Sequence, residues 1–141
     1  MENSIVVRQE IIRQETLKWY HLGLELFPQE ELPLEIVFNL VGTISGRAHC
    51  GKNDGKHVIH YNWQLADENW EKFTTVTIPH EVAHIIADMF FKEMWPQGCD
   101  HTSLWEFVMV KFGIKNPSKY HTYDVSTVSV TGSTGKKMAV L

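Results

Sequence analysis

Apolar residues recur at helical spacing through the first part of the chain. Four of them stand seven positions apart: Ile5, Ile12, Trp19 and Leu26. Because an α-helix turns once in about 3.6 residues, such positions share one side of a helix. A proline follows directly after residue 27, and proline cannot continue a helix. The pattern predicts one long amphipathic helix over residues 5–27, with its apolar stripe packed into the core.

Three short β-favouring runs follow this helix. They are the segments LPLEIVFNLV, TISGRAHCG and KHVIHYNWQL. The linker GKNDG between the last two contains the asparagine, aspartate and glycine that favour a tight turn. In the third run, Ile59, Tyr61 and Trp63 alternate with His60 and Asn62, so the two sets point to opposite faces. We expect a small antiparallel sheet of about three strands.

The second half of the chain predicts further helices. Asp67 can cap a helix that begins near ENWEKF, and Pro79 either kinks that helix or stands in the first turn of a new one. Residues 80–92 are helical under both alternatives. After the loop MWPQGCD, the segment HTSLWEFVMVKFG has helical character and closes at a glycine. We therefore expect one α+β domain over residues 1–124 and a loosely held tail over 125–141, which is rich in Ser, Thr and Gly.

Composition and charge limit the class of protein. The chain has 141 residues and a hydrophobic content of 43%, which suit a single globular core. No apolar run approaches the ~18 residues that cross a bilayer, and the charged N-terminus lacks the apolar core of a signal peptide. We therefore expect a soluble, cytoplasmic protein. The formal net charge of −4 and the scattered basic residues do not support a domain that grips nucleic acid strongly by itself.

The candidate chemistry lies in TIPHEVAHIIADMFF, where polar residues interrupt an apolar run. Buried imidazoles and carboxylates are costly unless they are paired, so these residues are either incidental on an amphipathic helix or there to hold a metal. His80 and His84 are four residues apart, so one helical turn places both imidazoles on the same face, within reach of one Zn²⁺. Glu81 lies beside them, where it can take a proton from metal-bound water. This H-E-x-x-H arrangement is typical of a zinc metallopeptidase.

A catalytic zinc site needs a third protein ligand and an open position for water. His101, in GCDHTSLWEF, stands at the start of the next predicted helix and completes a site for one zinc per chain. In cytosolic H-E-x-x-H peptidases of the repressor-cleaving type the third ligand is commonly acidic, and Glu106 or Asp100 would then replace His101. A third interpretation is a zinc-stabilised module that binds a partner without turnover.

These motifs together resemble the SprT-like domain, the family of the bacterial SprT proteins and the eukaryotic DNA–protein crosslink protease Spartan. The resemblance covers Leu17 to Val125 and rests on IPHEVAHII, HTSLWEF and the closing YHTYD, with SGRAHCG and HVIHYNWQL upstream. It implies a zincin-like fold, in which a long N-terminal helix and a small sheet accompany the H-E-x-x-H helix and a further helix with the third ligand. It also implies zinc-dependent peptide hydrolysis, with His80, His84 and His101 as ligands and Glu81 as the catalytic base.

The resemblance extends to substrates and partners. DNA-bound proteins are substrates of the best-known member, so we expect a protein or peptide substrate, and DNA is a partner that the family implies but the net charge does not support. His121, in YHTYD, is the preferred donor to the developing oxyanion, and Tyr120 and Tyr123 are its alternatives.

Substrate contacts are expected from the third β-favouring run. The strand 56–63 lies either at a sheet edge, where an extended substrate adds to it, or in the sheet interior. His60 and Asn62 are its candidate substrate-binding residues. The chain departs from the family in two places: Thr102 stands where a glycine usually follows the third histidine, and the two cysteines of the chain cannot build the four-cysteine ribbon of many members. We therefore expect a minimal catalytic core.

Overall fold

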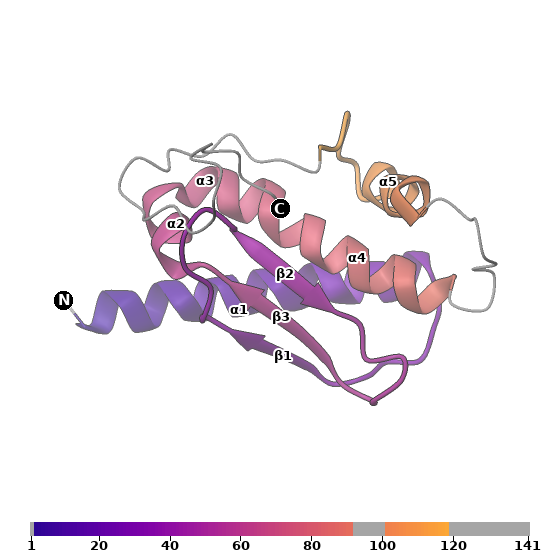
Figure 1. Cartoon of the computed structure of the whole chain (residues 1–141), viewed down its shortest axis with the longest axis horizontal. Coiled ribbons are helices and arrows are strands. Elements are labelled where there is room, and N and C mark those ends of the chain that lie inside the picture. The colour runs from indigo at the N-terminus through magenta and orange to yellow at the C-terminus, as the bar shows by residue number, and fades with distance from the viewer. Residues whose placement is uncertain (1, 92–100, 119–141) are drawn as a thin grey trace.

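The computed structural model describes residues 2–91 and 101–118 of the chain (Figure 1). Its elements, in chain order, are α1 (Glu2–Leu26), β1 (Leu34–Val37), β2 (Gly46–His49), β3 (His57–Tyr61), α2 (Trp63–Glu68), α3 (Trp70–Lys72), the π-helical turn η1 (Phe73–Thr77), α4 (Ile78–Phe90) and α5 (His101–Lys111). The architecture is α+β, as predicted. The predicted loop at 94–100 and the predicted tail at 125–141 lie outside the described residues.

Helix α1 confirms the long N-terminal helix but turns a different stripe to the core. The buried positions on and directly after it stand three or four apart: Ile12, Thr16, Tyr20, Gly23 and Phe27. The predicted seven-residue stripe is wrong at both ends, because Ile5 is 45% exposed and Leu26 is 44% exposed. A straight helix drifts by ~20° per seven residues, so a strict heptad leaves the core-facing side.

The helices pack closely where α1 crosses α4. A Cβ atom built on Gly23 of α1 would lie 2.5 Å from Cγ1 of Ile86 in α4, so only a glycine admits this approach of the two helices. In the view of Figure 1, α1 lies behind the sheet, and α4 runs along the side of the sheet nearest β2. The core lies between these layers, and Ile59 and Tyr61 of β3 are fully buried in it.

The sheet is mixed rather than antiparallel. Its strand order is β1-β3-β2, with β2 antiparallel and β1 parallel to β3. The number of strands was predicted correctly, but the antiparallel pairing is wrong for β1. The chain reverses between β1 and β2 and again at the GKNDG turn before β3, so β3 runs in the direction of β1 and inserts between the two earlier strands.

Strand β3 therefore occupies the sheet interior. Of the two alternatives for the run 56–63, the edge position is wrong, since β3 is hydrogen-bonded to both neighbours. The strand also ends earlier than expected, at Tyr61, because the side chain of Asn62 caps the next helix: its Oδ1 accepts a hydrogen bond from Leu65 N–H at 3.2 Å. Asp67, the predicted cap, lies inside α2 instead.

The helical segment before the H-E-x-x-H motif changes geometry at Pro79. This residue stands in the first turn of α4, directly after the π-helical turn η1, so the second alternative for Pro79 is the one observed. Proline lacks an N–H group and is tolerated in a first turn, where the N–H groups have no intrahelical acceptor. In the described parts of the chain, no helix is long and apolar enough to cross a membrane.

Candidate metal centre

Helix α4 brings the two predicted histidine ligands together. His80 is 1% exposed, and His84 is half-buried one turn later on the same face. Their Nε2 atoms lie 3.1 Å apart, and their ring centroids are 4.8 Å apart. Two nitrogens bound to one tetrahedral zinc at ~2.0–2.1 Å are separated by about 3.3 Å. The pair therefore has the spacing that a shared metal ion requires, and one of the two imidazoles donates a hydrogen bond to the other.

Glu81 lies beside this pair in a dry environment. It is 1% exposed, and its Oε2 atom is 4.0 Å from Nε2 of His80. Within the described residues, this Oε2 atom has no hydrogen-bond partner. Burial raises the pKa of the Glu81 carboxyl to about 8, against the opposing effect of the Arg47 charge. A cation held by the histidines would favour the ionised carboxylate, so the unpaired oxygen fits a site that contains a metal.

Strand β2 places a glycine against this carboxylate. A Cβ atom on Gly46 would lie 2.9 Å from Cγ and 3.0 Å from Oε2 of Glu81. Gly46 is also the first residue of β2, and helix α4 packs against this strand. The missing side chain therefore makes room for Glu81. The family resemblance includes SGRAHCG, but it did not predict this contact. The sequence signal for such a close approach is a glycine within a β-favouring run.

Helix α5 contributes a tryptophan to the histidine pair. Trp105 is 1% exposed, and its Nε1–H donates a hydrogen bond to the main-chain oxygen of His80 at 3.1 Å. Its ring is stacked on His84, with centroids 5.4 Å apart and planes 18° apart, and it is tilted against His80 at 4.5 Å. Both predicted ligands therefore contact one indole.

The third ligand lies at the border of the described structure. Helix α5 begins at His101, one turn before Trp105. The side chain of His101, like Asp100, lies outside the described residues, and the described side chains form no group of three metal ligands. Glu106 is exposed and does not join His80 and His84 in such a group.

The predicted oxyanion and substrate residues are not gathered around Glu81 in the described part of the chain. His121 and its alternatives, Tyr120 and Tyr123, lie outside that part. His60 lies on the face of β3 opposite to the buried Tyr61, and its Nδ1 is 2.9 Å from Oδ1 of Asn39.

Asn62 has a structural set of contacts. It is 1% exposed, and its Nδ2 donates hydrogen bonds to the main-chain oxygens of Gly42 at 2.9 Å and Ile44 at 3.0 Å. Together with the cap on α2, these bonds tie the loop before β2 to the end of β3. Substrate contact by His60 or Asn62 remains a prediction.

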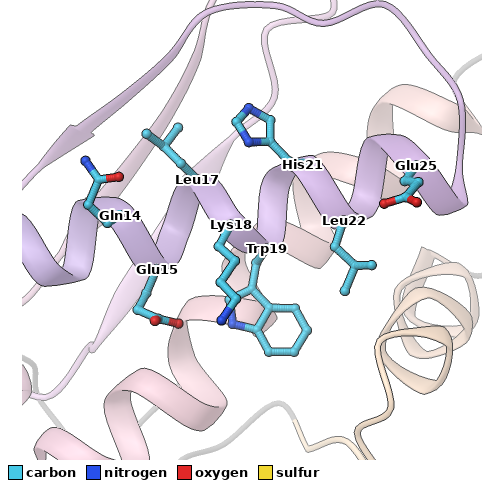
Figure 2. Close-up of a pocket in the computed structure, with 8 residues that line it drawn as sticks. All are labelled: Gln14, Glu15, Leu17, Lys18, Trp19, His21, Leu22 and Glu25. Atoms are coloured by element: carbon cyan, nitrogen blue, oxygen red, sulfur yellow. The ribbon is translucent and has the colours of Figure 1, made fainter.

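A pocket elsewhere on the molecule contains none of these residues. Its described lining comes from α1 alone: Gln14, Glu15, Leu17, Lys18, Trp19, His21, Leu22 and Glu25. Figure 2 shows Trp19 and Leu22 on one side of α1 and Leu17 and His21 on the other. This lining combines charged, polar and apolar side chains, and its described residues supply no group of three metal ligands.

Comparison with known proteins identifies the family. The SprT-like family model matches residues 14–125. The chain is 30% identical over 122 residues to Protein SprT of Pseudomonas putida strain F1, and the aligned region covers 86% of this chain and 70% of the relative. It is 37% identical over 97 residues to Protein SprT of Pseudomonas fluorescens strain Pf-5, which covers 68% of this chain and 54% of the relative. No solved structure matches the chain. By this match and these relatives, the chain belongs to the SprT-like family.

Proposed function

We propose that this chain is a zinc-dependent metallopeptidase that hydrolyses peptide bonds. The observation that carries the proposal is the convergence of the Nε2 atoms of His80 and His84, 3.1 Å apart, beside the buried carboxylate of Glu81. An incidental set of polar residues on an amphipathic helix would place these groups toward solvent, whereas His80 and Glu81 are each 1% exposed. Membership of the SprT-like family supports the same chemistry.

His101 is the proposed third ligand, for one zinc per chain. Position 101 shares a helix face with Trp105, whose ring contacts both other ligands. Glu106 is one residue further round the helix and is exposed, so of the two acidic alternatives Glu106 is not favoured as the third ligand. When bound, zinc supplies a polarised scissile carbonyl and a water of lowered pKa.

Glu81 is the proposed general base. From the buried position beside His80, its Oε2 atom accepts the proton of the attacking water and then passes it to the leaving amine. Because Glu81 is 1% exposed, bulk water has little access to its carboxylate, which then acts on the reacting groups without competition from solvent. His121 is the proposed oxyanion donor.

We further propose that the substrate binds along β2. Among the described strands, β2 pairs only with β3, so its other edge has no strand partner there. Gly46 at the start of β2 contacts Glu81, which places this edge beside the proposed base. An extended polypeptide added to β2 would therefore carry its main chain past the site. Proteins in an unfolded state are the expected substrate class, and DNA-associated proteins are proposed by family membership alone.

Two measurements test the function. Elemental analysis of purified protein should find one zinc per chain, substantially lost in His101→Ala. Glu81→Gln should retain the zinc and abolish cleavage of a fluorescently labelled unfolded protein, while Glu106→Gln serves as a matched control and stays active. Full cleavage by Glu81→Gln would refute the assigned base. Zinc retention without cleavage in the wild type would favour the binding module.

A further inference from the structure

Trp105 contacts the predicted ligands His80 and His84 through both its indole N–H group and its ring. A buried indole N–H needs an acceptor, and here it uses a main-chain oxygen within the H-E-x-x-H turn itself, that of His80. In a regular α-helix this oxygen also accepts the amide of His84 four residues later. The indole therefore adds a second donor to the turn that carries both predicted ligands.

The ring contacts restrict how the imidazoles turn. His84 lies flat on the indole, with planes 18° apart, so rotation of its ring about the Cβ–Cγ bond would break the stack. His80 is held against the same indole at a centroid distance of 4.5 Å and an angle of 58°. Both rings thereby keep their Nε2 atoms pointed at one place, 3.1 Å apart.

The hydrogen bond also fixes α5 relative to α4. Because it joins a side chain of α5 to the main chain of α4, it sets where the first turn of α5 lies along α4. His101 is four residues before Trp105, on the same side of the helix. One residue therefore contacts both predicted ligands of α4 and joins that helix to α5.

We propose that Trp105 is a positioning residue that prepares the histidine ligands for zinc before the metal arrives. The inference rests on the proposed function and adds to it a determinant of metal affinity that is not itself a ligand. Groups that orient ligands in this way typically contribute 10- to 100-fold to metal affinity. The competing explanation is that Trp105 is an ordinary core residue, whose loss weakens the fold without a specific effect on zinc.

Three variants separate these explanations. Trp105→Leu removes the ring and the N–H group, and Trp105→Phe keeps a ring but loses the N–H group. Phe112→Leu is the matched control, because Phe112 follows α5 directly and packs on Trp19 of α1, with ring centroids 5.2 Å apart. Zinc dissociation constants are measured on the full chain by competition with a chromophoric chelator. The visible absorption of the Co²⁺-substituted protein reports the ligand geometry, and urea unfolding of the metal-free protein reports stability.

The proposal expects Trp105→Leu to weaken zinc binding about 10- to 100-fold and to change the Co²⁺ spectrum. Trp105→Phe should lie between it and the wild type, and Phe112→Leu should lose stability but keep its zinc affinity and spectrum. Equal weakening in Trp105→Leu and Phe112→Leu, or unchanged affinity in both Trp105 variants, overturns the proposal. If Trp105→Leu does not fold, an unchanged affinity and spectrum in Trp105→Phe overturns it. A wild-type chain that binds no zinc overturns both the proposed function and this inference. A wild-type chain that binds zinc, with unchanged affinity in both Trp105 variants, overturns this inference alone.

Discussion

The contact between Gly46 and Glu81 makes a quantitative prediction for Gly46→Ala. The added Cβ would lie 2.9 Å from Cγ, 3.1 Å from Cδ and 3.0 Å from Oε2 of Glu81, whereas carbon atoms in van der Waals contact are about 3.5–4.0 Å apart. The carboxylate must therefore move by roughly 0.5–1 Å or the strand must shift away from α4. Overpacking of this size costs about 1–3 kcal/mol of folding stability.

The same displacement should reach the chemistry. Misplacement of a catalytic group by about 1 Å lowers the rate by about 100-fold. We expect Gly46→Ala to lower kcat about 10- to 100-fold. The zinc content should stay unchanged, because the new methyl group contacts Glu81 and not the two predicted histidine ligands.

A double-mutant cycle tests the cause without an activity assay. In a Glu81→Ala background the obstructing atoms are absent, so Gly46→Ala should cost less than about 0.5 kcal/mol there, which gives a coupling of about 1–3 kcal/mol between the two sites. The free energies of unfolding come from urea denaturation of the metal-free proteins. If Gly46→Ala costs the same in both backgrounds, the steric argument is refuted and the loss belongs to the strand itself.

Two further predictions concern stability. His57 is fully buried and accepts a hydrogen bond from Gly51 N–H at Nδ1, and burial lowers its pKa to about 4, below the ~6.5 of an unfolded chain. Between pH 6.5 and 4 the unfolded state therefore binds one more proton than the folded state, so acidification over this window should remove up to about 3 kcal/mol of stability. His57→Gln should flatten the pH dependence of the unfolding free energy measured in urea; an unchanged pH dependence would contradict this. Asn62→Ala should cost about 2–4 kcal/mol, because it removes the cap on Leu65 and the donors to Gly42 and Ile44. Asn62→Asp keeps the cap but places a buried carboxylate oxygen against the two main-chain oxygens, so at neutral pH it should cost at least as much as Asn62→Ala in the same denaturation assay; a clearly smaller loss would contradict the assigned donors.

Local signals in the sequence predicted the local parts of the molecule. The spacing of His80 and His84 predicted a shared helix face, and the structure places their Nε2 atoms 3.1 Å apart. Helical periodicity also predicted α1, and β-favouring runs predicted three strands. These features depend on contacts within one or two turns of the chain, which the residues themselves determine.

The features that the sequence did not predict depend on contacts between distant segments. Alternation along β3 indicates that one face is buried, but it says nothing about which strands flank it, so the parallel β1–β3 pair was missed. Asn62 and Asp67 are both good caps by residue type. Asn62 is the one used because its donors also reach the loop before β2, and no local pattern encodes that loop's position.

The candidate metal centre also combines local features with contacts between distant segments. The predicted ligands and base, His80, Glu81 and His84, come from one turn of α4 and were identified from the sequence. Their orientation depends on β2 and α5, through a glycine that leaves space for a carboxylate and an indole that holds two imidazoles. An H-E-x-x-H motif placed on a helix without these two neighbours would have the ligands and the base, but would leave the imidazoles free to rotate. Gly46 and Trp105 supply no ligand and no proton. Variants at these two positions should therefore change the rate (Gly46) and the zinc affinity (Trp105) while the H-E-x-x-H motif stays intact.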